Sequence, residues 1–373
     1  MTSSSNRNPW HPSEFIDACQ REGAVSNVAG PALDIAQRIK AQGQDLPVLF
    51  SLEHLAATVD VPIGLLLSYV QRGKDPYRVF SVSKQGSKGL RSNRRTICVP
   101  EPLLSKTQSW IAAQLLNNCT PHPASTAYAP GSSLAKAVRP HCEARWLLKV
   151  DLKNFFESID ELKVFDTFVS MGYPRPICFQ MARLCTRVFG AERGDNASTR
   201  LGVLPQGAPS SPMLANLSVY RLDVSLSEIA SRSGWNYSRY ADDLAFSTRL
   251  ESSRHATKDL MWSIFDEIRS FGLTTNKRKT IISPPGTRKV LLGLNVDTDR
   301  PRLTRSFKNN VETHVYAITN PEIGFNKHLE ARGFRSGPSM IRHIAGLIAY
   351  ARSIEPDYAE KLYKRLTTEA VRS

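Results

Sequence analysis

Two adjacent carboxylates stand between two β-rich segments in the second half of the chain. Asp242 and Asp243 follow Tyr240 and Ala241, and the apolar runs on either side predict a hairpin with the acidic pair at its turn. Neighbouring carboxylates repel each other unless a cation is bound. Mg²⁺ prefers hard oxygen ligands of this kind, together with substrate phosphates. The pattern therefore indicates metal-dependent phosphoryl chemistry.

A third carboxylate, Asp151, ends an apolar segment that predicts a strand, and residues 152–159 after it have a helical pattern. The carboxyl end of a strand is where ligand sites collect in many sheets. Two metal ions about 4 Å apart can activate an attacking hydroxyl and stabilise a leaving pyrophosphate. We therefore predict one two-metal site from Asp151, Asp242 and Asp243. A bare Asp-Asp pair is more often a solvated turn, and the flanking strands argue against that alternative.

The chain is strongly basic, with a formal net charge of +15, which indicates a polyanionic partner. Basic residues concentrate in residues 71–95 and 277–308, and phosphate contacts explain two such runs better than solvated surface does. No run of about 18 uncharged apolar residues indicates a membrane span. The first residues lack the pattern of a secretory signal, and the scattered cysteines lack metal-ligand spacing. We expect a cytoplasmic protein.

The hydrophobic pattern predicts a sheet core with helices behind it and a helical C-terminal region. Residues 1–45 are expected to be an N-terminal extension of uncertain order. Ile341, Ile344 and Ile348 are expected on one face of the best C-terminal helix. The other predicted elements are helical residues 46–73, a hairpin of 77–83 and 94–100 with a basic tip at 84–93, a helix at 102–118, a loop at 186–203, one long helix at 208–230, a helix at 257–272, and strands at 274–283 and 289–296.

The acidic motifs resemble those of the reverse transcriptase family. Residues 240–243 are similar to its YxDD motif, residues 151–156 to its first catalytic-aspartate motif, and residues 204–212 to its LPQG segment, in the family's order. Within the family, the chain most resembles the bacterial retron reverse transcriptases, over about residues 57 to 365. Two segments depart from the retron pattern: only His141 remains of an NAxxH motif, and only Gly293 of a VTG motif.

The resemblance implies a role for each matching residue. Asp151, Asp242 and Asp243 would bind two Mg²⁺ ions, with the Leu152 carbonyl as an extra ligand. The incoming dNTP would be contacted by Arg95, Phe156, Gln206 and Lys279, with Phe156 excluding a ribose 2′-hydroxyl. Primer and template would be contacted by Tyr240, Ala241, Leu292, Gly293 and Leu294, the last three forming the primer grip.

Some positions keep two interpretations. Lys84 and Lys88 are either phosphate contacts or solvated loop lysines. His141 is either a contact to structured RNA or an ordinary histidine.

The resemblance also implies an α+β fold of the right-hand polymerase type, with fingers at 46–145, a palm with an antiparallel sheet at 146–298, and a helical, RNA-binding thumb at 299–373. The implied activity is RNA-directed DNA synthesis from dNTPs, giving a short cDNA (msDNA) on a structured non-coding RNA that serves as template and primer. A separate effector protein and an anti-phage role are implied too. The alternatives are a group II intron-like or other defence-associated reverse transcriptase, or a template-independent DNA polymerase on the same fold.

Overall fold

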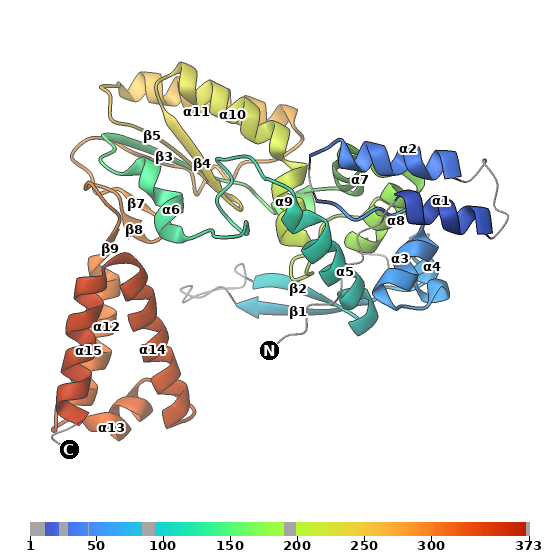
Figure 1. Cartoon of the computed structure of the whole chain (residues 1–373). Coiled ribbons are helices and arrows are strands. Elements are labelled where there is room, and N and C mark those ends of the chain that lie inside the picture. The colour runs from blue at the N-terminus through green and yellow to red at the C-terminus, as the bar shows by residue number, and fades with distance from the viewer. Residues whose placement is uncertain (1–11, 22–28, 44, 84–93, 190–198, 371–373) are drawn as a thin grey trace. The chain divides into compact units, whose positions relative to one another are not determined.

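The computed structural model of the protein describes residues 12–21, 29–43, 45–83, 94–189 and 199–370. Helices and antiparallel sheets make up the fold, which divides into two compact units (Figure 1). The chain passes between the units several times, so neither unit is one continuous stretch. The first unit consists of Met1–Gly131, Leu152–Ser225 and Glu267–Thr275, and the second of Ser132–Asp151, Leu226–Asp266 and Asn276–Ser373.

The first unit is mainly helical and holds one two-stranded sheet. β1 (Tyr77–Ser83) and β2 (Arg94–Pro100) pair antiparallel over their whole length, which confirms the predicted hairpin. Its predicted basic tip, with Lys84 and Lys88, lies outside the described residues. The other elements are α1 (Pro12–Arg21), α2 (Ala29–Lys40), α3 (Leu52–Val59), α4 (Ile63–Val70), α5 (Pro102–Gln114), η1 (Leu116–Asn118), η3 (Phe156–Ser158), α7 (Glu161–Ser170), α8 (Arg175–Cys185), α9 (Ser211–Ser218) and the start of α10 (Tyr220–Arg232).

The segment before residue 46, expected to be of uncertain order, contains two helices in its described part. α2 buries Ala32, Ala36 and Ile39. Its end packs so closely on Gly172 that a Cβ at that glycine would lie 2.7 Å from the Arg38 carbonyl oxygen. α2 therefore belongs to the core of the first unit.

The helix predicted directly after Asp151 is absent. Asn154 has a φ of 49°, a left-handed conformation that an α-helix cannot contain, and only the short 3₁₀ turn η3 follows it. α7 starts later, at Glu161, where the Asp160 side chain caps the helix by accepting a hydrogen bond from the Lys163 N–H at 2.9 Å.

The long helix predicted at residues 208–230 is divided into α9 and α10. Val219 lies between them with φ −104° and ψ 15°, and its N–H bonds to the Leu217 carbonyl rather than to the residue four positions earlier. The helical hydrogen-bond ladder is interrupted there, so Tyr220 and Arg221 begin a new helix.

The second unit contains a four-stranded antiparallel sheet in the order β4-β5-β3-β6. β3 (Trp146–Asp151) is buried along its length except at Lys149, as its apolar sequence predicted. β4 (Asn236–Tyr240) and β5 (Asp243–Thr248) form the predicted acidic hairpin, and β6 (Ile281–Ser283) pairs with the other edge of β3.

Residues 289–296, predicted as one strand, form a small hairpin instead. β7 (Val290–Leu291) turns at Leu292 and Gly293 into β8 (Leu294–Asn295), which pairs with β9 (Arg302–Leu303). One buried cluster joins this sheet to the larger one and to the C-terminal helices, and full burial of each leucine contributes about 1.5–3 kcal/mol. The cluster consists of Val138, Leu147, Ala245, Leu291, Leu294, Val296, Leu303, Ala351 and Ala359.

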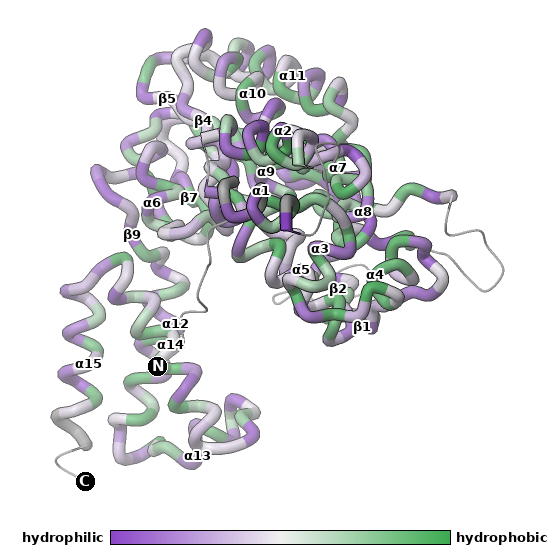
Figure 2. Tube along the Cα trace, turned by 45° about the vertical axis from the view of Figure 1, so that its right-hand side comes forward, coloured by the Kyte–Doolittle hydropathy of each residue, from purple (hydrophilic) through white to green (hydrophobic). Residues whose placement is uncertain are grey.

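The predicted helical C-terminal region is confirmed. Hydrophobic and hydrophilic residues alternate along α12 and α15 (Figure 2), and Val311, Val315 and Leu362 form their shared core. Ile344 is buried as expected, but Ile341 is 57% exposed, because the packed stripe of α14 (Gly337–Ile354) starts at the fully buried Met340 instead. The remaining elements of this unit are α6 (Leu134–Val138), η2 (Arg139–His141), most of α11 (Arg254–Ser270), α12 (Arg305–Thr319), α13 (Gly324–Ala331), α14 (Gly337–Ile354) and α15 (Pro356–Ala370).

In the described part of the chain, no helix has both the length and the apolar composition that crossing a membrane requires.

Candidate active site

The acidic hairpin turns through two residues only, Ala241 and Asp242, because Tyr240 pairs directly with Asp243. Ala241 has a φ of 56°, a left-handed conformation that costs a non-glycine residue about 1–2 kcal/mol. Ala241 is buried, and its carbonyl accepts a hydrogen bond from the buried Arg239 guanidinium at 3.2 Å. The turn is therefore held in one shape, which fixes the direction in which the two aspartates leave the backbone.

Asp151 joins this pair from the neighbouring strand. β3 and β5 are antiparallel, and their register places Asp151 directly opposite Asp243. Asp151 is buried, Asp242 is half-buried and Asp243 is exposed. The structure thus brings together the three carboxylates that the sequence nominated, at adjoining strand ends.

The three carboxylates disturb one another electrostatically. The pKa of Asp243 is raised to about 6, first by desolvation and then by repulsion from Asp242 and Asp151, against the attraction of Lys279 and Lys149. A cation bound between the carboxylates would offset this repulsion and lower the pKa of Asp243 again. The exposed surface of Asp243 leaves room for such a cation. The site therefore favours a cation.

The donor set fits a magnesium ion that arrives with its substrate. Among the residues that the structure describes, no group of three or more His, Cys, Asp or Glu side chains converges as a closed metal site requires. An open site does not need such convergence, because Mg²⁺ is usually held by one or two carboxylates with waters and substrate phosphates.

Lys279 belongs to the same cluster. The Asn276 N–H donates to the Asp151 carbonyl at 2.7 Å, and the Lys279 N–H donates to the Asn276 carbonyl at 3.0 Å. This turn brings the Lys279 ammonium onto the Asp151 carboxylate as an ion pair, while 54% of the lysine side chain stays exposed. Lys279, which the resemblance places beside the triphosphate, thus lies beside the aspartates.

The predicted primer grip lies on the β7–β8 turn. Leu292 and Gly293 have φ values of 48° and 81°, the pattern of a type I′ hairpin turn. A Cβ at Gly293 would meet no atom within 4 Å, so the glycine is required here by its conformation, and its outer side is open. Lys149 connects this hairpin to β3, because its ammonium donates to the Val290 carbonyl at 3.1 Å.

The remaining nucleotide-site candidates lie in the first unit. The Gln206 carbonyl accepts a hydrogen bond from the Cys98 N–H of β2 at 2.8 Å, so the Gln206 loop is fixed to the strand that carries the exposed Arg95. Gly207, with a φ of 109°, permits this approach, because a Cβ there would lie 2.9 Å from Ile97.

Phe156 is half-buried on η3 and contacts Phe155 and Tyr128 at ring-centroid distances of 5.6 and 6.3 Å. Leu152 is buried and forms an isolated β-bridge with Thr275.

Sequence reasoning missed a buried ion cluster that anchors the Gln206 loop. Glu161 accepts hydrogen bonds from the Arg72 guanidinium, from Arg183 at 3.2 Å and from the Gly202 N–H at 3.1 Å. The side chains of Glu161 and Arg72 are 4% and 7% exposed. Arg72 lies in the basic run 71–95 that the sequence predicts to contact phosphates, and for this residue the prediction is wrong. The only sequence signal was an acid in the first turn of a helix.

His141 is a structural residue. It is fully buried, and its Nδ1 and Nε2 each lie 2.7 Å from a hydroxyl, of Ser247 and Ser238 respectively. Burial lowers its pKa to about 4, so the ring is neutral at pH 7. The alternative that His141 contacts RNA is therefore excluded.

Comparisons with known proteins agree with this geometry. Residues 82–296, more than half of the chain, match the family described as "Reverse transcriptase (RNA-dependent DNA polymerase)". The chain is 29% identical over 323 residues to the Retron Ec86 reverse transcriptase of Escherichia coli, across 87% of this chain and 89% of that protein. It is 30% identical over 343 residues to the Retron Mx65 reverse transcriptase of Myxococcus xanthus, across 86% and 72%.

Among solved structures, a telomerase from Candida albicans aligns over 85% of this chain and 58% of that one, with 13% identity and a TM-score of 0.45, a likeness too weak to add to the argument. The family match carries the right-hand polymerase fold, and the helices and antiparallel sheets agree with it. The chain belongs to the reverse transcriptase family, and within it to the retron reverse transcriptases, which makes it an RNA-directed DNA polymerase.

Proposed function

We propose that the protein synthesises a short cDNA (msDNA) on a structured non-coding RNA by two-metal phosphoryl transfer at Asp151, Asp242 and Asp243. The meeting of these three carboxylates at the adjoining ends of β3 and β5 is the observation that supports this site. Two bound Mg²⁺ ions supply the charge that activates an attacking hydroxyl and stabilises a leaving pyrophosphate.

The chain's own residues contribute positioning and charge. The rigid turn at Ala241 holds Asp242 and Asp243 in fixed directions. The Lys279 ammonium, paired with Asp151, balances part of the charge of the three carboxylates. Little further acid–base chemistry is needed, because positioning and electrostatics carry most of phosphoryl transfer.

The other roles follow from the family resemblance. Arg95 and Gln206 contact the incoming dNTP, Phe156 rejects a ribose 2′-hydroxyl, and the Leu152 carbonyl completes a metal site. Tyr240 and the turn of Leu292 and Gly293 contact primer and template, while the buried Ala241 and Leu294 shape the two turns from inside. The subdomains are fingers at 46–145, palm at 146–298 and thumb at 299–373. A separate effector protein, an anti-phage role and a cytoplasmic location complete the proposal.

The site is tested by replacing single aspartates. Asp242→Asn and Asp243→Asn keep the shape of the side chain and remove its charge. We expect both variants to lose Mg²⁺-dependent incorporation of dNTPs while they still bind RNA. Unchanged incorporation in either variant would refute the assignment of the site.

Templating is tested by sequencing the nucleic acid that purifies with the protein from its native host. A single defined cDNA, joined to RNA, is the expected product. A homopolymer or a random sequence would instead identify a template-independent polymerase.

A further inference from the structure

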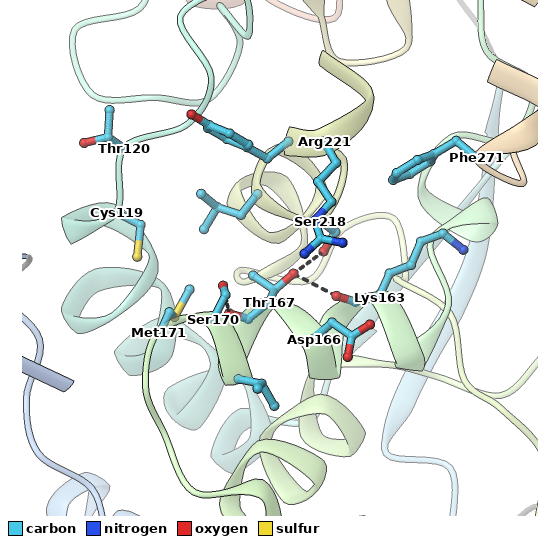
Figure 3. Close-up of a pocket in the computed structure, with 13 residues that line it drawn as sticks. Cys119, Thr120, Lys163, Asp166, Thr167, Ser170, Met171, Ser218, Arg221 and Phe271 are labelled. Carbon is cyan, nitrogen blue, oxygen red and sulfur yellow. Dashed lines mark hydrogen bonds between the residues drawn. The ribbon is translucent and has the colours of Figure 1, made fainter. Parts of the chain in front are cut away.

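A cavity that the aspartate cluster does not line lies in the first unit. It has a volume of about 790 Å³, within the usual range for a ligand pocket. Its walls come from α7, from the junction of α9 and α10, from the segment after η1, and from Phe271 after α11 (Figure 3).

The two sides of the pocket differ in chemistry. Figure 3 shows Arg221, Lys163 and Asp166 on the side near Phe271, while Cys119 and Met171 lie on the other side. One side therefore offers charges and the other an apolar, polarisable wall.

The charges on this side are available to a ligand. Lys163 is paired with Asp160 at 2.9 Å and still lines the pocket. Within the described part of the chain, the exposed side chains of Arg221 and Asp166 form no hydrogen bond or ion pair. An unpaired guanidinium can bind a phosphate, and an unpaired carboxylate can accept a hydrogen bond from a ribose hydroxyl or an exocyclic amine.

An exposed aromatic ring stands at the rim. Tyr220 is 41% exposed, and the edge contact with His122, at 5.4 Å and 77°, holds its ring. Tyr220 and Arg221 line the pocket from the start of α10, directly after the interruption at Val219. Unpaired RNA bases are typically bound by such rings, with arginine beside them.

Hydroxyl groups fix the inner wall. The Thr167 and Ser218 hydroxyl oxygens lie 3.0 Å apart and connect α7 to the end of α9. Thr167 also contacts the Lys163 carbonyl at 2.8 Å, and Ser170 donates to the Thr167 carbonyl at 2.7 Å. The wall is therefore formed before any ligand arrives.

We infer that this pocket binds an unpaired nucleotide of the RNA on which the enzyme acts, with its base on Tyr220, its phosphate on Arg221 and Lys163, and a hydroxyl or amine on Asp166. The inference rests on the proposed function, since it assumes a structured RNA partner. A stacking surface, an unpaired guanidinium and an unpaired carboxylate around one cavity match a ribonucleotide better than a protein side chain.

The test uses the full chain, saturated with a blunt, fully paired RNA–DNA duplex, so that the polymerase site is filled and no unpaired nucleotide competes with the probe. The probe is a short single-stranded RNA that contains 4-thiouridine, and its affinity is measured by fluorescence anisotropy. Tyr220→Ala is expected to weaken binding about tenfold, as loss of one stacked base does. Tyr220→Phe should bind as the wild type does. Arg221→Ala should weaken binding and lower the salt dependence by about one phosphate contact.

The matched control is Arg232→Ala, which removes an exposed arginine from the other end of α10 and should leave affinity unchanged. Equal losses in Arg221→Ala and Arg232→Ala would overturn the inference, since they would show nonspecific charge effects. Equal competition by duplex RNA would overturn it, and so would the absence of a photo-cross-link within residues 161–171 or 217–221 of the wild type. If Tyr220→Ala and Arg221→Ala bound RNA normally but no longer bound a purified protein partner, the pocket would be assigned to that protein instead.

Primer extension separates this inference from the proposed function. If the wild type extends the primed RNA template and no variant changes the affinity for the probe, only the inference about the pocket is refuted. If the wild type extends no RNA template, the proposed function itself is refuted.

Discussion

The aspartate cluster of the second unit and the Glu161 cluster of the first unit handle charge in opposite ways. Asp151, Asp242 and Asp243 crowd negative charge together, and one of their pKa values is raised to about 6. Glu161 is surrounded by Arg72 and Arg183, so its buried charge is matched. Charge that a protein leaves unbalanced is available to a ligand, whereas balanced buried charge fixes a loop. This contrast favours a ligand at the aspartate cluster and a structural role for the Glu161 cluster.

The largest effect on activity is expected at the aspartate cluster. Asp243→Asn should lower dNTP incorporation about a thousandfold or more, because a bound metal ion supplies several kcal/mol to the reaction. The same change removes carboxylate repulsion, so the free energy of unfolding in urea should stay constant or rise. Asp299→Asn, at an exposed aspartate elsewhere in the second unit, should change neither quantity. A marked loss of stability in Asp243→Asn would make the aspartates a structural cluster and break the comparison.

Glu161→Gln should have the opposite profile. It leaves two arginines partly buried beside a neutral amide, and breaking a buried ion pair costs about 3–5 kcal/mol of unfolding free energy. Because Glu161 also holds the Gly202 N–H, four residues before Gln206, KM for dNTP should rise more than kcat falls. Glu101→Gln is the control, since its exposed pair with Lys74 is worth less than about 1 kcal/mol. A stable variant with normal KM would mean that the loop holds its shape without Glu161.

The two clusters also differ in what a sequence can predict. Asp242 and Asp243 stand in one short hairpin, and Asp151 ends one apolar strand, so local patterns were enough to nominate all three. Arg72, Glu161 and Arg183 are held together only by tertiary packing, with sequence separations of 89 and 22 residues. No local pattern distinguishes their charges from solvated ones.

The same reasoning explains the missed turns. The interruption at Val219 and the left-handed Leu292 occur at residue types that do not mark turns strongly. Asn154 and Gly293 are turn residues, but the patterns around them indicated a helix and a strand. At each position the local pattern predicts that the helix or strand continues, whereas the structure has a turn that tertiary packing determines.

A smaller effect is expected from acid at His141, because its folded pKa of about 4 lies below the usual 6.5. The unfolded chain therefore binds the proton first, and the stability that His141 contributes is lost as the pH falls below about 6.5. At pH 5 the loss is about 2 kcal/mol relative to pH 7. In His141→Gln, urea unfolding should be less dependent on pH by this amount. An equal dependence in both proteins would show that His141 is already free to protonate.

The smallest predicted effect tests whether the first unit also contributes a group to substrate choice. The half-buried Phe156 ring is held by Phe155 and Tyr128, so truncation in Phe156→Ala opens space without removing a buried charge. If that ring excludes a 2′-hydroxyl, the ratio of kcat/KM for dCTP to that for CTP, which differ only at this position, should fall about tenfold, the size of a single steric discrimination. Phe156→Tyr keeps the ring and should keep the ratio. Tyr128→Phe is the matched control, because it leaves both neighbouring rings in place. An unchanged ratio in Phe156→Ala would reduce Phe156 to a packing residue, and the first unit would then contribute shape alone.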